Sequence, residues 1–133
     1  MEVLNADISF GTQKEVEILN RLSAYFGENI QRATDKFSPY DGFSENAKYE
    51  IKSRRTRYNQ YPTTIIGVNK LKTEFQKLIF CFNFTDKLCY IEYNEEKFKH
   101  YAKQPVSAIR SYGIRTDKDH IFIPIQDLIE IKT

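Results

Sequence analysis

The stretch "YDGFSENAKYEIKSRRTRY", residues 40–58, decides how this sequence is interpreted, because it joins a turn, a strand and a dense group of charges. Asp41 and Gly42 form a dipeptide that is typical of tight turns. Glu50-Ile51-Lys52 follows in a segment with the period of a β-strand. We therefore predict a strand over residues 47–53, with the carboxylate and the ammonium on one face and Ile51 on the other.

Each of these signals has an ordinary explanation when it is taken alone. Asp41 can simply close a turn. Lys48 and Arg54 share the predicted strand face with Glu50 and Lys52, which is also the pattern of a solvated face. Only the combination of these residues with other parts of the chain favours a functional site.

The first such part is a predicted helix over residues 12–26. Its apolar stripe consists of Ile18, Leu19, Leu22 and Phe26, and Gly27 supplies a stop. Glu15 lies at the head of the same stripe, whereas Glu17 points elsewhere. An acid on the buried side of a helix is uncommon. The alternative is a carboxylate stabilised by the helix dipole.

The rest of the chain alternates strand and helix signals. We expect strands at residues 31–37, 63–68 and 120–125, a hairpin of residues 78–84 and 88–93, and helices at 69–77 and 94–102. Residues 125–131 are expected to form a short helix or strand, and residues 107–118 include a glycine-containing loop. This order predicts one α/β domain over residues 1–133, with a central mixed β-sheet flanked by helices.

The composition excludes several classes of protein. Hydrophobic residues make up 41% of the chain and charged residues 29%, which is ordinary for a folded domain and unlike a disordered one. A net charge of +2 does not by itself identify a nucleic-acid binder, so any basic surface must be local. The two cysteines are not a close pair of zinc ligands, and no segment resembles a secretion signal. A cytoplasmic protein with reduced thiols is expected.

Asp41, Glu50 and Lys52 together have the chemistry that phosphodiester cleavage requires. Two carboxylates and the backbone carbonyl of Ile51 are hard oxygen ligands of the kind that Mg²⁺ prefers. A bound ion would polarise the phosphate and lower the pKa of a water molecule. The Lys52 ammonium can orient that water and neutralise charge on the phosphate.

The pattern resembles the PD-(D/E)xK nuclease superfamily. Here it reads Pro39-Tyr40-Asp41, eight further residues, and then Glu50-Ile51-Lys52. The additional helix glutamate of that superfamily matches Glu15, and the resemblance covers residues 11–70. One departure is Tyr40, which separates Pro39 from Asp41, where the superfamily has the proline directly before the acid.

This resemblance implies a restriction-endonuclease-like fold and an Mg²⁺-dependent DNA endonuclease, for which Mn²⁺ can substitute. Asp41, Glu50 and the Ile51 carbonyl would hold the metal, Glu15 would support it directly or through water, and Lys52 would act in catalysis. The small size is similar to that of Holliday-junction resolvases, which act on branched DNA, usually as homodimers, and leave 5′-phosphate and 3′-hydroxyl ends. The alternatives are a sequence-specific nuclease of restriction or homing type and a non-catalytic nucleic-acid-binding module.

A basic segment directly after the predicted strand favours a polyanionic partner. Arginines contact phosphates, and tyrosines can stack on exposed bases. We therefore expect DNA contacts from Arg54, Arg55, Arg57, Tyr58 and Lys70. The alternative is a polar hairpin tip, and for Lys70 a DNA contact and a role in solubility are equally good explanations. In a viral source the expected location would be the cytoplasm or nucleoid of the host cell.

Overall fold

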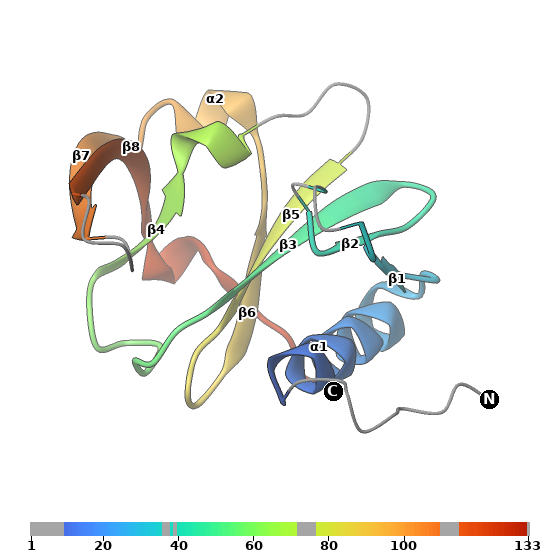
Figure 1. Cartoon of the computed structure of the whole chain (residues 1–133). Helices are drawn as coiled ribbons and strands as arrows, with labels where there is room; N and C mark the ends of the chain where they lie inside the picture. The colour runs from blue at the N-terminus through green and yellow to red at the C-terminus, as the bar shows by residue number, and fades with distance from the viewer. Residues whose placement is uncertain (1–9, 36–37, 39, 72–76, 110–114, 133) are drawn as a thin grey trace.

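The computed structural model describes residues 10–35, 38, 40–71, 77–109 and 115–132 (Figure 1). The elements run in the order α1 (Phe10–Phe26), β1 (Gln31–Arg32), β2 (Gly42–Phe43), β3 (Ala47–Ser53), β4 (Thr63–Gly67), the 3-10 turn η1 (Val68–Lys70), β5 (Lys77–Asn83), β6 (Leu88–Glu92), α2 (Glu95–Phe98), β7 (Ala102–Ile109), β8 (Arg115–Pro124), the 3-10 turn η2 (Ile125–Asp127) and β9 (Ile129–Glu130).

Helix α1 forms where its apolar stripe predicted it. Ile18, Leu19 and Leu22 are buried against the sheet. The helix ends at Gly27, whose φ of 66° is a left-handed conformation that glycine adopts without strain. The amide of Gly27 donates to the carbonyl of Ser23 at 2.9 Å, which closes the last turn.

Within the part of the chain that the structure describes, a six-stranded sheet has the order β1-β2-β3-β5-β6-β9. Strands β3 and β5 are parallel, whereas the other neighbours in this sheet are antiparallel. The predicted strand over residues 47–53 coincides with β3, and β5 and β6 form the predicted hairpin. The sheet is therefore mixed, as the sequence predicts.

The two faces of this sheet are covered differently (Figure 1). On one face α1 packs on Tyr49 and Cys81, and on the other face Phe80 and Phe82 pack with residues of β4, β8 and α2. Strands β4, β8 and β7 form a second, three-stranded sheet in the described residues. The α/β class is confirmed, but one of the two flanking layers is mostly a sheet rather than helices. β5 alternates its residues between the two cores, which explains its almost continuous apolar sequence.

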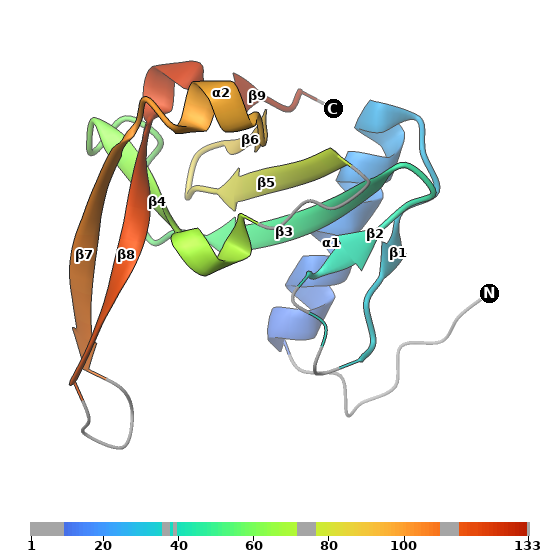
Figure 2. The same cartoon turned by 90° about the horizontal axis from the view of Figure 1, so that it is seen from above.

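The second sheet is the part that sequence patterns predicted least well. Residues 102–109, expected to be helix end and loop, form β7 and pair with β8, and the two strands extend as a hairpin from the body (Figure 2). Exposed polar residues and Pro105 hide the alternation that usually marks a strand.

The helix predicted at 94–102 is shorter, because α2 ends at Phe98. Residues 36–37 of the first predicted strand and 72–76 of the helix predicted at 69–77 lie outside the described residues.

Both cysteines are free and buried, on the neighbouring strands β5 and β6. Burial raises the pKa of Cys81, and the charge of Asp41 raises it further. Burial raises the pKa of Cys89 to about 11. The two thiols therefore stay protonated and act as small core side chains.

None of the described helices has the length and apolar character needed to cross a membrane.

Candidate active site

Asp41 lies directly beside β3. Gly42 pairs with Tyr49 at the end of the β2–β3 ladder, and Asp41 comes directly before Gly42. The Asp41 amide donates to the Tyr49 carbonyl at 3.0 Å, and the Ile51 amide donates to Asp41 Oδ2 at 2.6 Å. The carboxylate thus takes the place of a backbone carbonyl in the ladder, and this bond fixes it next to Glu50.

Gly42 is required for the approach of helix α1 to this edge. A Cβ atom at Gly42 would lie 2.7 Å from Leu19 Cδ2 and 3.2 Å from the Gln31 carbonyl oxygen. A larger residue would therefore require the Leu19 side chain to shift and would make a tight contact with the Gln31 carbonyl. The close packing brings Glu15 of α1 toward Asp41.

Glu50 is almost fully buried, with 4% of its surface exposed. Lys52 Nζ lies 3.3 Å from Glu50 Oε1, and Lys70 Nζ of η1 lies 3.7 Å from the same oxygen. Glu50 and Lys52 share a face of β3, as the strand period predicted. Within the described residues, Glu50 Oε2 is the buried side-chain polar atom that lacks a hydrogen-bond partner.

The electrostatics of the site couple three acids. Burial raises the pKa of Glu50, the Asp41 charge raises it further, and Lys52 and Lys70 oppose this change. Burial also raises the pKa of Glu15, Asp41 adds to that rise, and Arg32 opposes it. Asp41 therefore repels both glutamates, and this repulsion between carboxylates is what a cation would relieve.

Glu15 and Glu17 differ in the way the helical stripe predicted. Glu17 is exposed, whereas Glu15 is partly buried. Arg32 Nε of β1 donates to Glu15 Oε1 at 3.3 Å. Sequence reasoning did not single out Arg32, because a lone arginine at the end of a short strand carries no pattern. The role of Glu15 in metal binding stays a prediction.

The residues at this edge fit a hard divalent cation. The expected ligands are the carboxylates of Asp41 and Glu50 and the carbonyl of Ile51, all of which are oxygen donors. A buried, unpaired carboxylate oxygen such as Glu50 Oε2 is costly, and a cation would satisfy it. In the described residues, no three His, Cys, Asp or Glu side chains form a metal-holding group. The three acids of the expected set, Glu15, Asp41 and Glu50, therefore do not form such a group, which leaves Asp41 and Glu50 as its two carboxylates.

Arg54 has a structural role that its sequence context did not indicate. Its Nε donates to Thr64 Oγ1 at 3.2 Å, and a second nitrogen, Nη2, donates to the Ile65 carbonyl. The guanidinium also lies over the Phe82 ring, 5.5 Å from the ring centroid. Burial lowers the pKa of Arg54. These bonds tie the end of β3 to β4, so the guanidinium is turned away from the surface where we expected it.

Tyr58 is also engaged within the fold. Its hydroxyl donates to the Ile125 carbonyl at 3.0 Å, and its ring meets Phe84 edge-on with centroids 5.9 Å apart. Lys87 Nζ lies 4.6 Å from the centroid of the same ring. The ring is therefore poorly placed to stack on a base. Arg55 and Arg57 of the same segment are exposed.

A cleft of about 860 Å³ runs beside the acidic edge, between α1 and the ends of β3 and β5. Glu15 and Ile51 line it, whereas Asp41, Glu50 and Lys52 are not among the residues that line it. Five cationic residues line it, from α1, the segment after β3 and the β5–β6 turn: Lys14, Arg21, Arg54, Arg55 and Lys87. Three of these were missed in the sequence, because single charges on separate elements form no motif until the fold brings them together.

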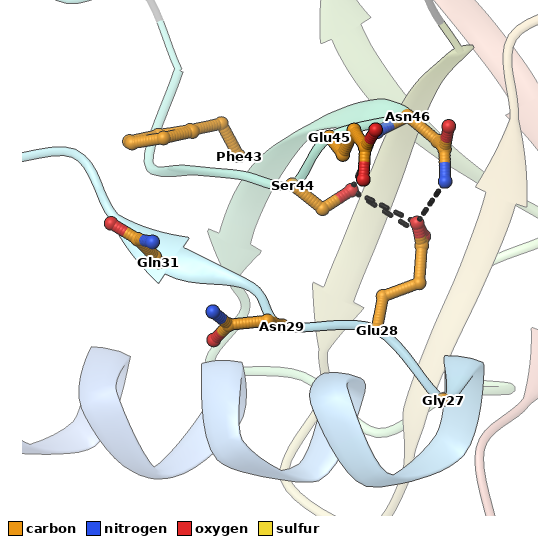
Figure 3. Close-up of a pocket in the computed structure, with 8 residues that line it drawn as sticks. All are labelled: Gly27, Glu28, Asn29, Gln31, Phe43, Ser44, Glu45 and Asn46. Atoms are coloured by element: carbon orange, nitrogen blue, oxygen red, sulfur yellow. Dashed lines mark hydrogen bonds between the residues drawn. The ribbon is translucent and has the colours of Figure 1, made fainter.

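A second cleft, of about 430 Å³, lies at the other end of the β2–β3 hairpin (Figure 3). Its central acid is Glu28, just after α1, which accepts hydrogen bonds from Ser44 Oγ at 3.1 Å and Asn46 Nδ2 at 3.1 Å. The Tyr49 hydroxyl donates to Glu28 Oε2 at 3.4 Å. Neutral donors thus hold both carboxylate oxygens, and the cluster fastens α1 to the hairpin turn.

No protein-family model, curated protein or solved structure matches this chain. The candidate site therefore has to be judged from its own geometry and from the motif in the sequence.

Proposed function

We propose that this protein is an Mg²⁺-dependent DNA endonuclease with a restriction-endonuclease-like fold. The observation that carries the proposal is the environment of Glu50, which is buried near Asp41 with one oxygen bound by two lysines and the other unpartnered. A solvated strand face, the ordinary explanation of the sequence pattern, would leave this carboxylate in water. Burial of an acid in such surroundings is instead typical of catalytic and metal sites.

Each residue of the site has a distinct chemical role in this proposal. Asp41, Glu50 and the Ile51 carbonyl hold the ion, which when bound supplies Lewis-acid activation of the phosphate and of a water molecule. The Lys52 side chain is 31% exposed and lies on the Glu50 face, so its ammonium can contact both the carboxylate and a phosphate. Lys52 orients the attacking water and neutralises charge on the phosphate. Glu15, held by Arg32, supports the metal directly or through water.

The cleft along α1, which Glu15 and Ile51 line, is the surface on which we place the DNA backbone. Its cations can contact successive phosphates, and these contacts position the strand without reading its sequence. Arg55 lies in the cleft, and Arg57 is exposed on the same segment. Of the five DNA contacts that the sequence predicts, we retain Arg55, Arg57 and Lys70. Arg54 and Tyr58 are left out, because their donors and ring are engaged in the fold.

Branched DNA is the substrate that we propose. Apart from the β7–β8 hairpin, the described elements form a compact core with short connections. Such a core favours recognition of DNA shape over readout of the bases. Cleavage of two strands at a junction needs two sites, which a homodimer supplies. By the resemblance noted above, the products would carry 5′-phosphate and 3′-hydroxyl ends.

A cleavage assay on labelled junction, flap, single-stranded and linear DNA tests the proposal. We expect cleavage of the junction with Mg²⁺ or Mn²⁺, DNA binding without turnover with Ca²⁺, and no cleavage in excess chelator. The Asp41→Asn variant is the control for a contaminating nuclease. Metal-independent cleavage, or DNA binding with no cleavage of any substrate, would overturn the proposal; the second result would favour a binding module. Preference for one linear sequence would favour a restriction-type enzyme.

A further inference from the structure

Lys70, which the sequence indicated only as a DNA contact or a solubilising charge, lies beside Glu50 in the structure. It belongs to η1, which follows β4, yet its ammonium lies 3.7 Å from Glu50 Oε1. Lys52 already lies 3.3 Å from that same oxygen. Two ammonium groups thus share one oxygen, while Oε2 on the other side of the carboxylate has no hydrogen-bond partner within the described residues.

Among the described residues, the acids and the cations of the cluster are equal in number before any ion is added. Three acids take part in its ion pairs and electrostatic couplings, together with three cations: Glu15, Asp41 and Glu50, and Arg32, Lys52 and Lys70. A divalent ion that entered this cluster would add two positive charges next to two ammonium groups. Its binding is therefore opposed by the lysines that stabilise Glu50 in its absence.

We propose that Lys70 is the resting counter-cation of Glu50, and that it competes with the divalent metal ion for this carboxylate. The inference rests on the metal site of the proposed function. In the metal-free protein, the Lys70 ammonium reduces the cost of burying Glu50. When the ion binds, the ammonium leaves Oε1 and becomes available to a DNA phosphate.

The geometry assigns this exchange to Lys70 rather than to Lys52. Lys52 lies two residues from Glu50 on the same strand face, and its shorter contact is a hydrogen bond that acts on the Glu50 carboxylate. Lys70 reaches Glu50 from a separate element, whose neighbours Val68 and Leu71 pack on the core. Its backbone is thus held in place, while its side chain, 26% exposed, is long enough to turn toward solvent or substrate.

One consequence is that metal and DNA bind cooperatively. A phosphate near Lys70 draws its ammonium away from Glu50 and so removes a competitor of the metal ion. By thermodynamic linkage, the metal must then raise the affinity for DNA by the same factor. The protein would bind divalent ions weakly until DNA is present.

The test is the affinity of the DNA-free protein for Mn²⁺, measured by calorimetry or by electron paramagnetic resonance. Lys70→Met keeps the length of the side chain and removes its charge, and we expect Mn²⁺ to bind about tenfold more tightly, within the usual range of couplings between sites. The control is Lys77→Met, which removes an exposed lysine paired with Glu92 at 3.9 Å. That variant should bind Mn²⁺ like the wild type.

Equal or weaker Mn²⁺ binding by Lys70→Met would overturn the inference, because it would show that Lys70 only supports Glu50. If the wild type still cleaves DNA in a metal-dependent way, this failure leaves the proposed function intact. Absence of Mn²⁺ binding in the wild type and both variants would instead overturn the metal site and, with it, the inference.

A second measurement guards against misfolding of the variant. Lys70→Gln and Lys70→Met should both show a wild-type circular dichroism spectrum and a lower melting temperature without metal, because Glu50 loses a counter-charge. Mn²⁺ should raise their melting temperatures more than that of the wild type, since tighter binding to the folded state gives a larger shift. An identical shift in all three proteins would count against competition.

Discussion

Two acidic clusters lie at opposite ends of the β2–β3 hairpin, one around the partly buried Glu28 and one around the buried Glu50, and they are built in different ways. Glu28 accepts hydrogen bonds from neutral donors on both of its oxygens. Glu50 has two ammonium groups at one oxygen, a repelling carboxylate nearby, and an unpartnered second oxygen. The first arrangement is complete, whereas the second is stabilised only in part by the protein itself.

In the proposed function, this difference is the one between a structural acid, Glu28, and a functional one, Glu50. A carboxylate that fastens two elements needs its hydrogen bonds satisfied, because each unsatisfied bond weakens the fold. A carboxylate that binds a cation must keep an oxygen available and tolerate repulsion from other ligands. Glu50 is the more deeply buried of the two acids, and the chemistry of their partners differs as well.

The largest expected effect concerns the proposed metal ligands. Asp41→Asn and Glu50→Gln should each lower the single-turnover cleavage rate about 1,000-fold, because the metal ion contributes several kcal/mol to transition-state stabilisation. Glu28→Ala should leave the rate per folded molecule unchanged. It should lower the free energy of unfolding by about 1–3 kcal/mol, because Ser44 loses its acceptor. Loss of cleavage in a folded Glu28→Ala protein would remove the distinction between the clusters.

The next effect separates catalysis from binding on the Glu50 face of β3. Lys52→Ala should reduce turnover about 100-fold, since positioned proton donors and acceptors contribute at least that much, while much of the DNA affinity remains. Lys48→Ala changes the same face two residues before Glu50, and we expect it to cleave normally. Measuring turnover and the DNA dissociation constant for both variants checks this. Normal cleavage by Lys52→Ala would return the face to an ordinary polar strand.

A smaller effect is expected on helix α1. Glu15→Ala should reduce cleavage about tenfold, as loss of a group that supports a metal ligand typically does. Glu17→Ala, which removes an exposed acid one half-turn away, should have little effect on the rate. Comparing kcat for the two variants at saturating Mg²⁺ decides the matter. A larger loss of cleavage in Glu17→Ala than in Glu15→Ala would mean that the metal lies on the side of α1 that carries Glu17.

The smallest effect per residue concerns the DNA contacts. Replacing Arg55 and Arg57 by alanine should weaken binding and reduce the slope of log affinity against log salt by about 0.9 for each lost phosphate contact. Arg54→Ala should leave that slope unchanged and lower the melting temperature instead, because it removes bonds to Thr64 and Ile65. Salt titrations of DNA binding, with thermal melts, measure both. An unchanged slope for the double variant would mean that the segment is only a solvated turn.

Much of the fold could be predicted because its strongest elements carry local patterns. The apolar stripe predicted α1, the alternation around Glu50-Ile51-Lys52 predicted β3, and runs of β-branched and aromatic residues predicted β4 and the β5–β6 hairpin. Strand β7 was missed, because its exposed residues show no alternation. The second sheet covers Phe80 and Phe82, and no local pattern shows that a sheet rather than a helix would bury them.

The candidate site also combines features that local sequence patterns predict with contacts that only the tertiary structure shows. The sequence by itself determined that Glu50 and Lys52 share a face and that Glu15, rather than Glu17, turns inward, because both follow from the periods of a strand and a helix. Only the tertiary structure decided that Lys70 meets Glu50, that Arg32 holds Glu15 and that Arg54 points into the fold. These contacts join residues whose separation along the chain carries no period. Their formation depends on how the layers pack, which is a property of the whole core.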